Sequence, residues 1–164
     1  MVITGMEMEI NIILRNKGEN INMNQTKKCD VCGNDVVIEQ YKDKVCKKCG
    51  WIQCEEALKT PNKMIYPNIT SLNHARELAK NGMKIKPTFE DFVESVRLNL
   101  EPSFKYNKRK LGSTNFSGYE FYEWNKEDGY QSYKTIEEFA QKVNIDGKYL
   151  KDIWDDVYQF EFGC

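Results

Sequence analysis

The sequence predicts an α+β protein, in which a small zinc ribbon is followed by a compact α+β unit with about four helices. Two Cys-x-x-Cys pairs predict the ribbon, and apolar residues at helical and strand spacing predict the second unit. The chain has 164 residues, 40% hydrophobic and 30% charged, which suits one domain or two small ones. The expected divisions are an N-terminal strand or leader (1–26), the zinc ribbon (27–54), a connector with a short helix (55–82) and the α+β unit (83–164).

The N-terminal leader has the alternating pattern of a strand over residues 6–12. Met23 offers an alternative start, which leaves open whether residues 1–22 belong to the native product. Glu7 and Glu9 interrupt the apolar stretch, so we expect no secretory signal there. No apolar run approaches the roughly 20 residues of a membrane span, and no membrane partner is expected.

The sharpest feature of the chain is a set of four cysteines at metal-ligand spacing. They are Cys29, Cys32, Cys46 and Cys49. Two residues between the ligands of a pair let one tight turn direct both sulfurs at the same metal. The glycines that follow, Gly33 and Gly50, supply the positive φ that such a turn needs. Four thiolates leave no open coordination position, so the pattern predicts a structural Zn²⁺ covered by Trp51.

Two alternatives stay open for these cysteines. A redox-active dithiol would need one thiol of lowered pKa, and iron would accept the same four ligands. The remaining cysteines, Cys54 and Cys164, are expected to be free thiols, with a disulfide between them as the alternative. Cysteines in metal spacing, rather than in a disulfide framework, favour a reducing, cytoplasmic location.

The connector is expected to end in a short helix. Pro61 and Pro67 make its first part irregular. Ser71 is then a favourable N-cap for a helix over residues 72–80, which Asn81-Gly82 ends.

The α+β unit begins with a stronger helix, which Thr88 caps and Pro102 ends. A basic loop is predicted over residues 105–110, and aromatic residues at strand spacing follow over residues 119–124. Asp128-Gly129 reads as a turn.

Two more helices and a closing strand complete the predicted unit. Thr135 and Glu138 form a capping box before one helix, residues 150–157 repeat the helical spacing, and residues 158–162 alternate as a strand. The residues expected to be mostly buried are Phe89, Phe92, Val96, Phe139, Val143, Leu150, Ile153 and Trp154.

The segment 135–157 also matches the pattern of a helix-turn-helix. Ala140 would allow a close helix crossing, Asn144 tolerates the left-handed turn conformation, and Asp146 would cap the second helix. A recognition helix enters a groove walled by phosphates, and three aspartates on the second helix oppose such docking. We therefore interpret this segment as a helical hairpin used for packing, with a DNA reader as the alternative.

Charge is distributed unevenly along the chain. Residues 111–164 hold five basic and eleven acidic side chains, a balance of −6, together with 13 of the 20 aromatic residues. Aromatic residues anchor interfaces and acidic residues steer basic partners, so this third predicts a docking face for a basic protein. The alternative is a solvated acidic surface over an aromatic core. The partner-binding candidates are Glu123, Trp124, Asp152, Asp155 and Asp156.

A second set of residues offers contacts to nucleic acid. The candidates in the basic loop are Lys105, Lys108, Arg109 and Lys110. With Phe104 and Tyr106 beside them, they could pair with phosphates and stack on the bases of a single strand. A charged surface loop is the alternative. The lysines of the ribbon are offset by neighbouring acidic residues, which weakens the case for contact there.

Residues spread over the ribbon and the following helix carry a family resemblance. They are Cys29-Asp30-Val31-Cys32-Gly33, Tyr41, Cys46-x-x-Cys49, Trp51, Asn68-Ile69-Thr70-Ser71-Leu72 and Ala75-Arg76. This set resembles the bacterial cysteine-rich CPCC family over roughly residues 27–82. The Cys-Pro-Cys-Cys of that family is here Cys29-Asp30-Val31-Cys32. The resemblance implies a zinc ribbon joined to a helix in bacterial or phage proteins, some of them thought to sit among toxin–immunity genes.

Together these observations predict a non-enzymatic, zinc-stabilised protein that binds another protein. The expected role is a bacterial or phage immunity protein or inhibitor, which neutralises a basic toxin or defence nuclease. The sequence has no glycine-rich phosphate loop, no Gly-x-Ser-x-Gly and no His-Glu-x-x-His motif. The alternative is a nucleic-acid-binding regulator that uses the zinc ribbon, the 105–110 loop or the 135–157 hairpin. A metal-dependent or thiol enzyme is the third hypothesis.

Overall fold

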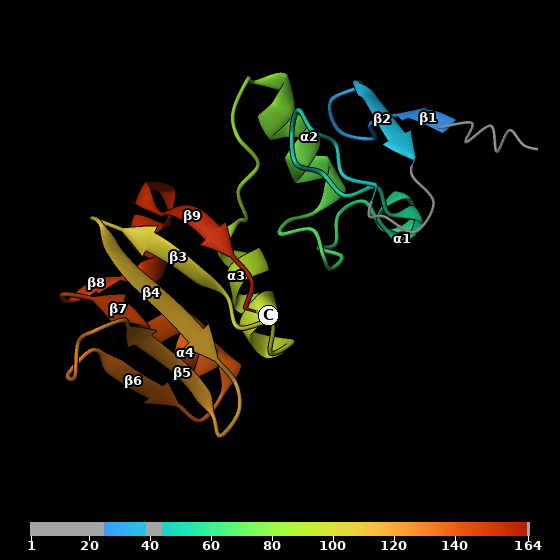
Figure 1. Ribbon diagram of the computed structural model, residues 1–164. Coiled ribbons are helices and arrows are strands. Elements are labelled where there is room, and N and C mark those ends of the chain that lie inside the picture. Colours follow the sequence, from blue (N-terminus) through green and yellow to red (C-terminus); the bar gives the residue numbers. More distant parts are fainter. Residues whose placement is uncertain (1–24, 39–43, 164) are drawn as a thin grey trace, which may run out of the picture.

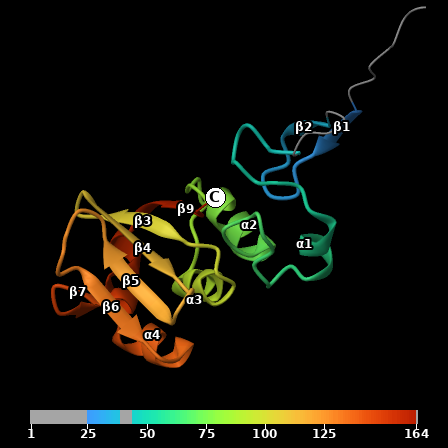
Figure 2. The same cartoon turned by 60° about the horizontal axis from the view of Figure 1, so that its bottom comes forward.

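The computed structural model describes residues 25–38 and 44–163. These residues form two groups of helices and strands, and each group packs around its own apolar cluster. The predicted strand over residues 6–12, and Cys164, lie outside these residues. Figures 1 and 2 show the two groups side by side. We call residues 25–38 and 44–82 the cysteine module, and residues 83–163 the C-terminal unit.

The cysteine module combines a two-stranded hairpin with two helices. Its elements are β1 (Gln25–Lys28), β2 (Asp35–Ile38), α1 (Glu55–Lys59) and α2 (Leu72–Lys80). The prediction for α2 is confirmed, because the Ser71 hydroxyl accepts a hydrogen bond from the His74 amide at the N-terminus. The helix buries Leu72, Ala75 and Leu78.

The C-terminal unit starts with α3 (Phe89–Arg97), whose predicted cap is confirmed. The Thr88 hydroxyl accepts from the Asp91 amide, and the Asp91 carboxylate accepts from the Thr88 amide, which is a full capping box. The helix ends several residues before Pro102, because Asn99 has a φ of 56° and leaves the helical conformation.

A five-stranded antiparallel sheet, in the order β6-β5-β4-β3-β9, forms the other half of this unit. Its strands are β3 (Ser103–Tyr106), β4 (Arg109–Thr114), β5 (Tyr119–Glu123), β6 (Tyr130–Tyr133) and β9 (Tyr158–Glu161). The two predicted strands, at residues 119–124 and 158–162, are thus β5 and β9. The first and last strands of the unit are neighbours in the sheet, because β9 pairs with β3.

The predicted basic loop over residues 105–110 is wrong, because this segment is a hairpin. Only Asn107 and Lys108 form the turn, and both have positive φ, 48° and 67°. Such a two-residue turn matches the twist of the flanking strands. The basic residues mask the strand period that the buried side chains of Phe104, Tyr106 and Leu111 follow.

The predicted helical hairpin over residues 135–157 is also wrong in its second half. Helix α4 (Ile136–Lys142) begins at Thr135, but the Glu138 carboxylate accepts from the Lys134 amide rather than completing the predicted box. Asp146 does not cap a helix. With φ values of 53° and 80°, Asp146 and Gly147 turn a small hairpin, because Asp-Gly favours the turn in which both φ values are positive.

The small hairpin separates α4 from the last helical segment. It consists of β7 (Asn144–Ile145) and β8 (Lys148–Tyr149), and a 3-10 helix, η1 (Leu150–Asp156), follows it. A DNA-reading helix-turn-helix is therefore not formed. Within the described part of residues 83–164, two α-helices and one 3-10 helix replace the expected four or so helices.

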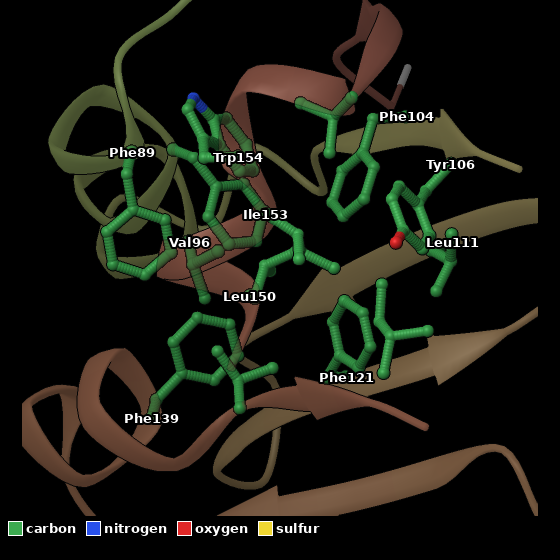
Figure 3. Packing of buried hydrophobic residues seen from close by; sticks show 14 residues of the cluster. Phe89, Val96, Phe104, Tyr106, Leu111, Phe121, Phe139, Leu150, Ile153 and Trp154 are labelled. Carbon is green, nitrogen blue, oxygen red and sulfur yellow. The ribbon is translucent and has the colours of Figure 1, made fainter. Parts of the chain in front are cut away.

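The core of the C-terminal unit lies between the sheet and α3, α4 and η1, which cover one face of the sheet (Figure 3). All eight residues predicted to be buried are at most 8% exposed. Phe92 lies at the centre, with its ring 4.9 Å from that of Trp154 and 5.5 Å from that of Phe104. The Trp154 indole donates to the Pro87 carbonyl over 2.9 Å, so this buried polar group has a partner.

Two of the following contacts join the cysteine module to the C-terminal unit, and the third links the start of that unit to η1. The Thr70 hydroxyl donates to the Asp91 carboxylate, and the rings of Tyr66 and Phe162 lie 5.7 Å apart. Lys86, just after the module, binds Asp155 on η1. Among the described residues, no helix has the length and apolar character needed to span a membrane.

Candidate metal centre

The four predicted cysteines meet at one point of the cysteine module. The Sγ atoms of Cys29, Cys32, Cys46 and Cys49 all lie within 4.8 Å of one another. Two of the separations, Cys29–Cys49 and Cys32–Cys46, are 3.6 Å. A tetrahedral site with metal–sulfur distances of about 2.3 Å places its sulfurs about 3.8 Å apart. The four thiols therefore have the geometry to hold one metal ion without a further ligand.

Two turns of the same design present the sulfurs. In the first, the Cys29 amide donates to the Asn34 carbonyl and the Gly33 amide to the Cys29 carbonyl. The second turn repeats this pattern: the Cys46 amide donates to the Trp51 carbonyl, and the Gly50 amide donates to the Cys46 carbonyl. The two glycines have φ values of 71° and 78°, which confirms the conformation predicted for them.

Side-chain amides around the sulfurs complete the environment of the site. The Asn34 amide donates to the Cys32 sulfur over 3.2 Å, and the Gln53 amide to the Cys29 sulfur over 3.4 Å. Gln53 is held in turn by the Asp30 amide, which donates to its side-chain oxygen. Such donors stabilise the negative charge that thiolates bring to a metal. Sequence reasoning missed both amides, although Asn34 directly follows the first turn.

The thiols do not ionise equally. Burial opposes ionisation of Cys32, but the hydrogen bonds from the Asn34 backbone and side chain, together with those from the neighbouring thiols, outweigh it and lower the pKa of Cys32 to about 6. Burial raises the pKa of Cys46 and of Cys49, and neighbouring thiols raise that of Cys49 further. The thiols must lose their protons to bind a metal, so metal affinity rises with pH.

Helix α2 and the residues before it form hydrogen bonds to both cysteine turns. The Asn68 side chain donates to the Ile52 carbonyl and accepts from the Ile52 amide, at 2.9 and 3.0 Å. Arg76 reaches from α2 to the Asp30 carbonyl over 2.8 Å. Trp51, 2% exposed, belongs to the same apolar cluster as Cys29 and Cys46, and its predicted role as a cover over the sulfurs stays a prediction.

Cys54, predicted to be a free thiol, forms no disulfide within the described residues. It is half-buried beside the apolar cluster of the cysteine module and occupies the N-cap position of α1, without a side-chain capping bond. It is not one of the four clustered thiols. It therefore offers a natural comparison for them.

The five partner-binding candidates lie on two sides of the sheet. Asp152, Asp155 and Asp156 are exposed on η1, which packs on the inner face. Trp124 contacts Lys110 and Tyr122 on the outer face. Glu123 points inward, where Arg109 binds it through two hydrogen bonds of 2.7 and 2.6 Å.

The four nucleic-acid candidates also do not share one surface. Arg109 is engaged by Glu123 and by Asp146, and these carboxylates hold the pKa of its guanidinium well above the usual value. Lys108 lies exposed in the turn. Lys105 and Lys110 are direct cross-strand partners and share the outer face.

Sequence reasoning missed a groove between α3, α4 and η1. Its volume is about 440 Å³, and its lining residues are Phe89, Glu90, Val93, Glu94, Ala140, Gln141, Tyr149, Lys151 and Asp152. Three acidic side chains and one basic side chain belong to this lining. Of the exposed aspartates of η1, Asp152 lines the groove together with apolar side chains of α3 and α4, and no single run of sequence contains the groove.

Comparisons with protein-family models, curated proteins and solved structures found no match to this chain. The resemblance to the CPCC family therefore stays a prediction from the residues. Three of the residues that carry it nevertheless have a physical role. Asn68 and Arg76 join the α2 region to the cysteine turns, and Ser71 caps α2.

Proposed function

We propose that the protein is a non-enzymatic, zinc-stabilised binding protein, which neutralises a basic protein partner as a bacterial or phage immunity protein or inhibitor. The observation that carries this proposal is the acidic groove between α3, α4 and η1. The family resemblance of the cysteine module supports the class of protein, and the groove supports the kind of partner.

The metal centre has a structural role in this proposal. Zn²⁺ favours four thiolates in tetrahedral arrangement, and such a closed set leaves no position for substrate or water. The amides of Asn34 and Gln53 donate to two different sulfurs and so favour thiolates in this cluster. The lowered pKa of Cys32 meets the condition for a reactive dithiol, but a metal held by all four thiolates would leave no free thiolate to react. The metal would thus hold the two turns against α2.

The groove suits a basic segment of another protein. Phe89, Val93 and Ala140 supply apolar surface, and Tyr149, 54% exposed, supplies an aromatic contact. Asp152 lies in the lining, and Asp155 and Asp156 are exposed further along η1. Apolar contact anchors such an interface, and the carboxylates attract the partner and select for positive charge. Glu123 and Trp124 are left out of this surface, because they lie elsewhere in the sheet.

Binding of labelled Lys/Arg-rich peptides to the zinc-loaded full chain tests the groove, with acidic peptides of equal length for comparison. Asp152→Lys with Asp155→Lys should weaken binding at least tenfold and slow association. The matched control is Glu127→Lys with Asp128→Lys, which reverses two exposed charges in the turn before β6 and should have little effect. Equal loss in both variants would refute a specific groove.

The inhibitor role is tested with a basic toxin or nuclease encoded beside this gene. Inhibition should reach an endpoint at one chain per enzyme molecule and should weaken as salt rises. Loss of inhibition in the Asp152→Lys, Asp155→Lys variant, with a retained metal content, would place the interface at the groove. Inhibition that continues at catalytic amounts of the protein would contradict a binding role.

A further inference from the structure

The outer face of the sheet, opposite the core, carries two rows of side chains that run across the strands. One row follows the pairing of Tyr158 with Lys105 and of Lys105 with Lys110, and ends at Trp124, whose amide donates to the Lys110 carbonyl. The second row contains Glu161, Ser103, Gly112, Tyr122 and Tyr130. Neighbouring rows on one face lie about 7 Å apart, which is two residues along a strand.

The first row brings two like charges together. Lys105 and Lys110 are directly opposite each other, an arrangement that destabilises an antiparallel pair. The ion pairs of the described residues leave both ammonium groups without a carboxylate partner. The Lys110 ammonium lies 4.7 Å from the centre of the Trp124 ring. Two adjacent ammonium groups that form no ion pair among the described residues, beside an aromatic ring, are suited to an anion that carries an aromatic group.

A cavity of about 300 Å³ lies at these lysines. Its lining residues are Ser103, Phe104, Lys105, Lys110, Gln159 and Glu161. The bulge at Gln159, with a φ of 52°, shifts the register between β3 and β9. Glu161 is the single carboxylate among the described residues that line this cavity.

The aromatic side chains of the two rows are arranged as a platform. A Cβ atom at Gly112 would lie 2.9 Å from ring atoms of Tyr122, so the Tyr122 ring covers this glycine. Its ring lies 5.9 Å from that of Trp124, and Tyr130 is its cross-strand partner. Trp124 is 49% and Tyr130 55% exposed. Exposed rings at neighbouring positions on a sheet are the surface on which unpaired bases stack.

We propose that this outer face binds single-stranded nucleic acid, with phosphates at Lys105 and Lys110 and bases on Trp124, Tyr122 and Tyr130. The proposal is distinct from a basic loop over residues 105–110, because Arg109 faces inward and is neutralised by Glu123 and Asp146. It is also independent of the acidic groove, which lies on the helical side of the sheet. A basic or neutral protein segment would gain nothing from Lys105 and Lys110 at this face, whereas the phosphates of a nucleic acid would bind both.

Fluorescence anisotropy with labelled RNA and DNA single strands of about ten nucleotides tests the platform on the zinc-loaded full chain. We expect binding to one or both strands, and much weaker binding to a duplex of the same sequence. Trp124→Leu should weaken binding about 5- to 150-fold, the range for loss of one stacking side chain. Lys105→Gln with Lys110→Gln should weaken it and reduce the slope of log affinity against log salt by about 1.4.

Two further variants make the result specific. Glu161→Gln removes a carboxylate from the cavity and should strengthen binding. Lys148→Gln with Lys151→Gln removes two exposed lysines from the helical side and should leave binding within about twofold. Trp124 is the one exposed tryptophan of three, so quenching of its emission by a bound strand gives a second readout.

Some results would overturn the proposal. Absence of single-strand binding at about 50 mM salt would do so, as would a preference for the duplex. Equal losses in the outer-face and helical-side lysine variants would show that only net charge matters. Equal affinity for RNA and DNA would indicate that the face contacts only bases and phosphates. Tighter binding of RNA would indicate a further contact to the 2′-hydroxyl.

Discussion

Replacing Cys46 with serine should unfold the cysteine module and leave the C-terminal unit folded. Cys46 is fully buried, and its sulfur lies 3.6 Å from that of Cys32, so a serine hydroxyl would replace one of four clustered thiols. The matched control is Cys54→Ser, which removes a half-buried thiol from the same module but no ligand. We expect one metal ion per chain in the wild type and in the control, and less than half in Cys46→Ser.

The size of the effect follows from how the module is built. A structural zinc site of this kind contributes an apparent ~10–16 kcal/mol at neutral pH. A whole domain is typically stable by only ~5–15 kcal/mol. The module has few large, fully buried apolar side chains of its own, namely Val36, Trp51 and Leu72. Loss of the metal should therefore remove all of its stability rather than part of it.

Two tryptophans make the two units separately visible. Trp51 is 2% exposed in the cysteine module, and Trp154 is 5% exposed in the core of the C-terminal unit. In Cys46→Ser the emission of Trp51 should shift to longer wavelength, whereas that of Trp154 should not. Trp51→Phe in the same background assigns the signals, and metal analysis after gentle purification gives the stoichiometry.

Two outcomes would contradict this reasoning. A Cys46→Ser protein with a full equivalent of metal and a buried Trp51 would mean that these four thiols are not the ligand set. Simultaneous exposure of Trp51 and Trp154 would mean that the contacts through Thr70 and Tyr66 couple the two units into one cooperative domain.

Three further predictions concern the C-terminal unit. Trp154→Ala should lower the free energy of unfolding by about 3–5 kcal/mol in a denaturant titration, whereas Phe116→Ala, at a 75% exposed position, should change it by under about 0.5 kcal/mol. The Arg109–Glu123 pair should show a coupling of about 2 kcal/mol in a double-mutant cycle, and the more exposed Glu94–Arg97 pair much less. Because the hydrogen bonds from Arg109 lower the pKa of Glu123, the stabilisation from that pair is fully present above the unfolded pKa of about 4.3 and is lost as the pH falls through the lower folded value. Gly112→Ala should lower the stability by about 1–3 kcal/mol and displace the Tyr122 ring, which its NMR shifts would report.

Features with a local physical cause could be predicted from the sequence. The spacing of the four cysteines sets how one turn presents two sulfurs, and Gly33 and Gly50 have the φ values that this turn requires. Helix α2 follows from Ser71 as N-cap, and α3 from the capping box of Thr88. The buried helical face could be predicted for the same reason, because a period of three to four residues is a property of the helix itself.

Features that depend on pairing across the chain could not be predicted in the same way. The strand period of residues 103–114 is hidden by basic residues on the outer face, and β3 becomes recognisable only between its neighbours β4 and β9. Asp146-Gly147 has a local signal for a hairpin turn, but the helical spacing on both sides favoured a cap. The groove draws its residues from α3, α4, β8 and η1, so no continuous segment could indicate it.

The two proposed surfaces make a joint prediction, because they lie on opposite sides of one sheet. Asp152 and Asp155 are exposed on η1 over the inner face, whereas Lys110 and Trp124 lie on the outer face, with the apolar core between them. Variants at well-separated sites have nearly additive effects. Asp152→Lys with Asp155→Lys should therefore leave single-strand binding unchanged, and Trp124→Leu should leave peptide binding unchanged. A saturating oligonucleotide should likewise not displace a basic peptide. Displacement of the peptide by the oligonucleotide would show that the two probes bind one surface. The variant that abolishes binding of both probes would then identify that surface.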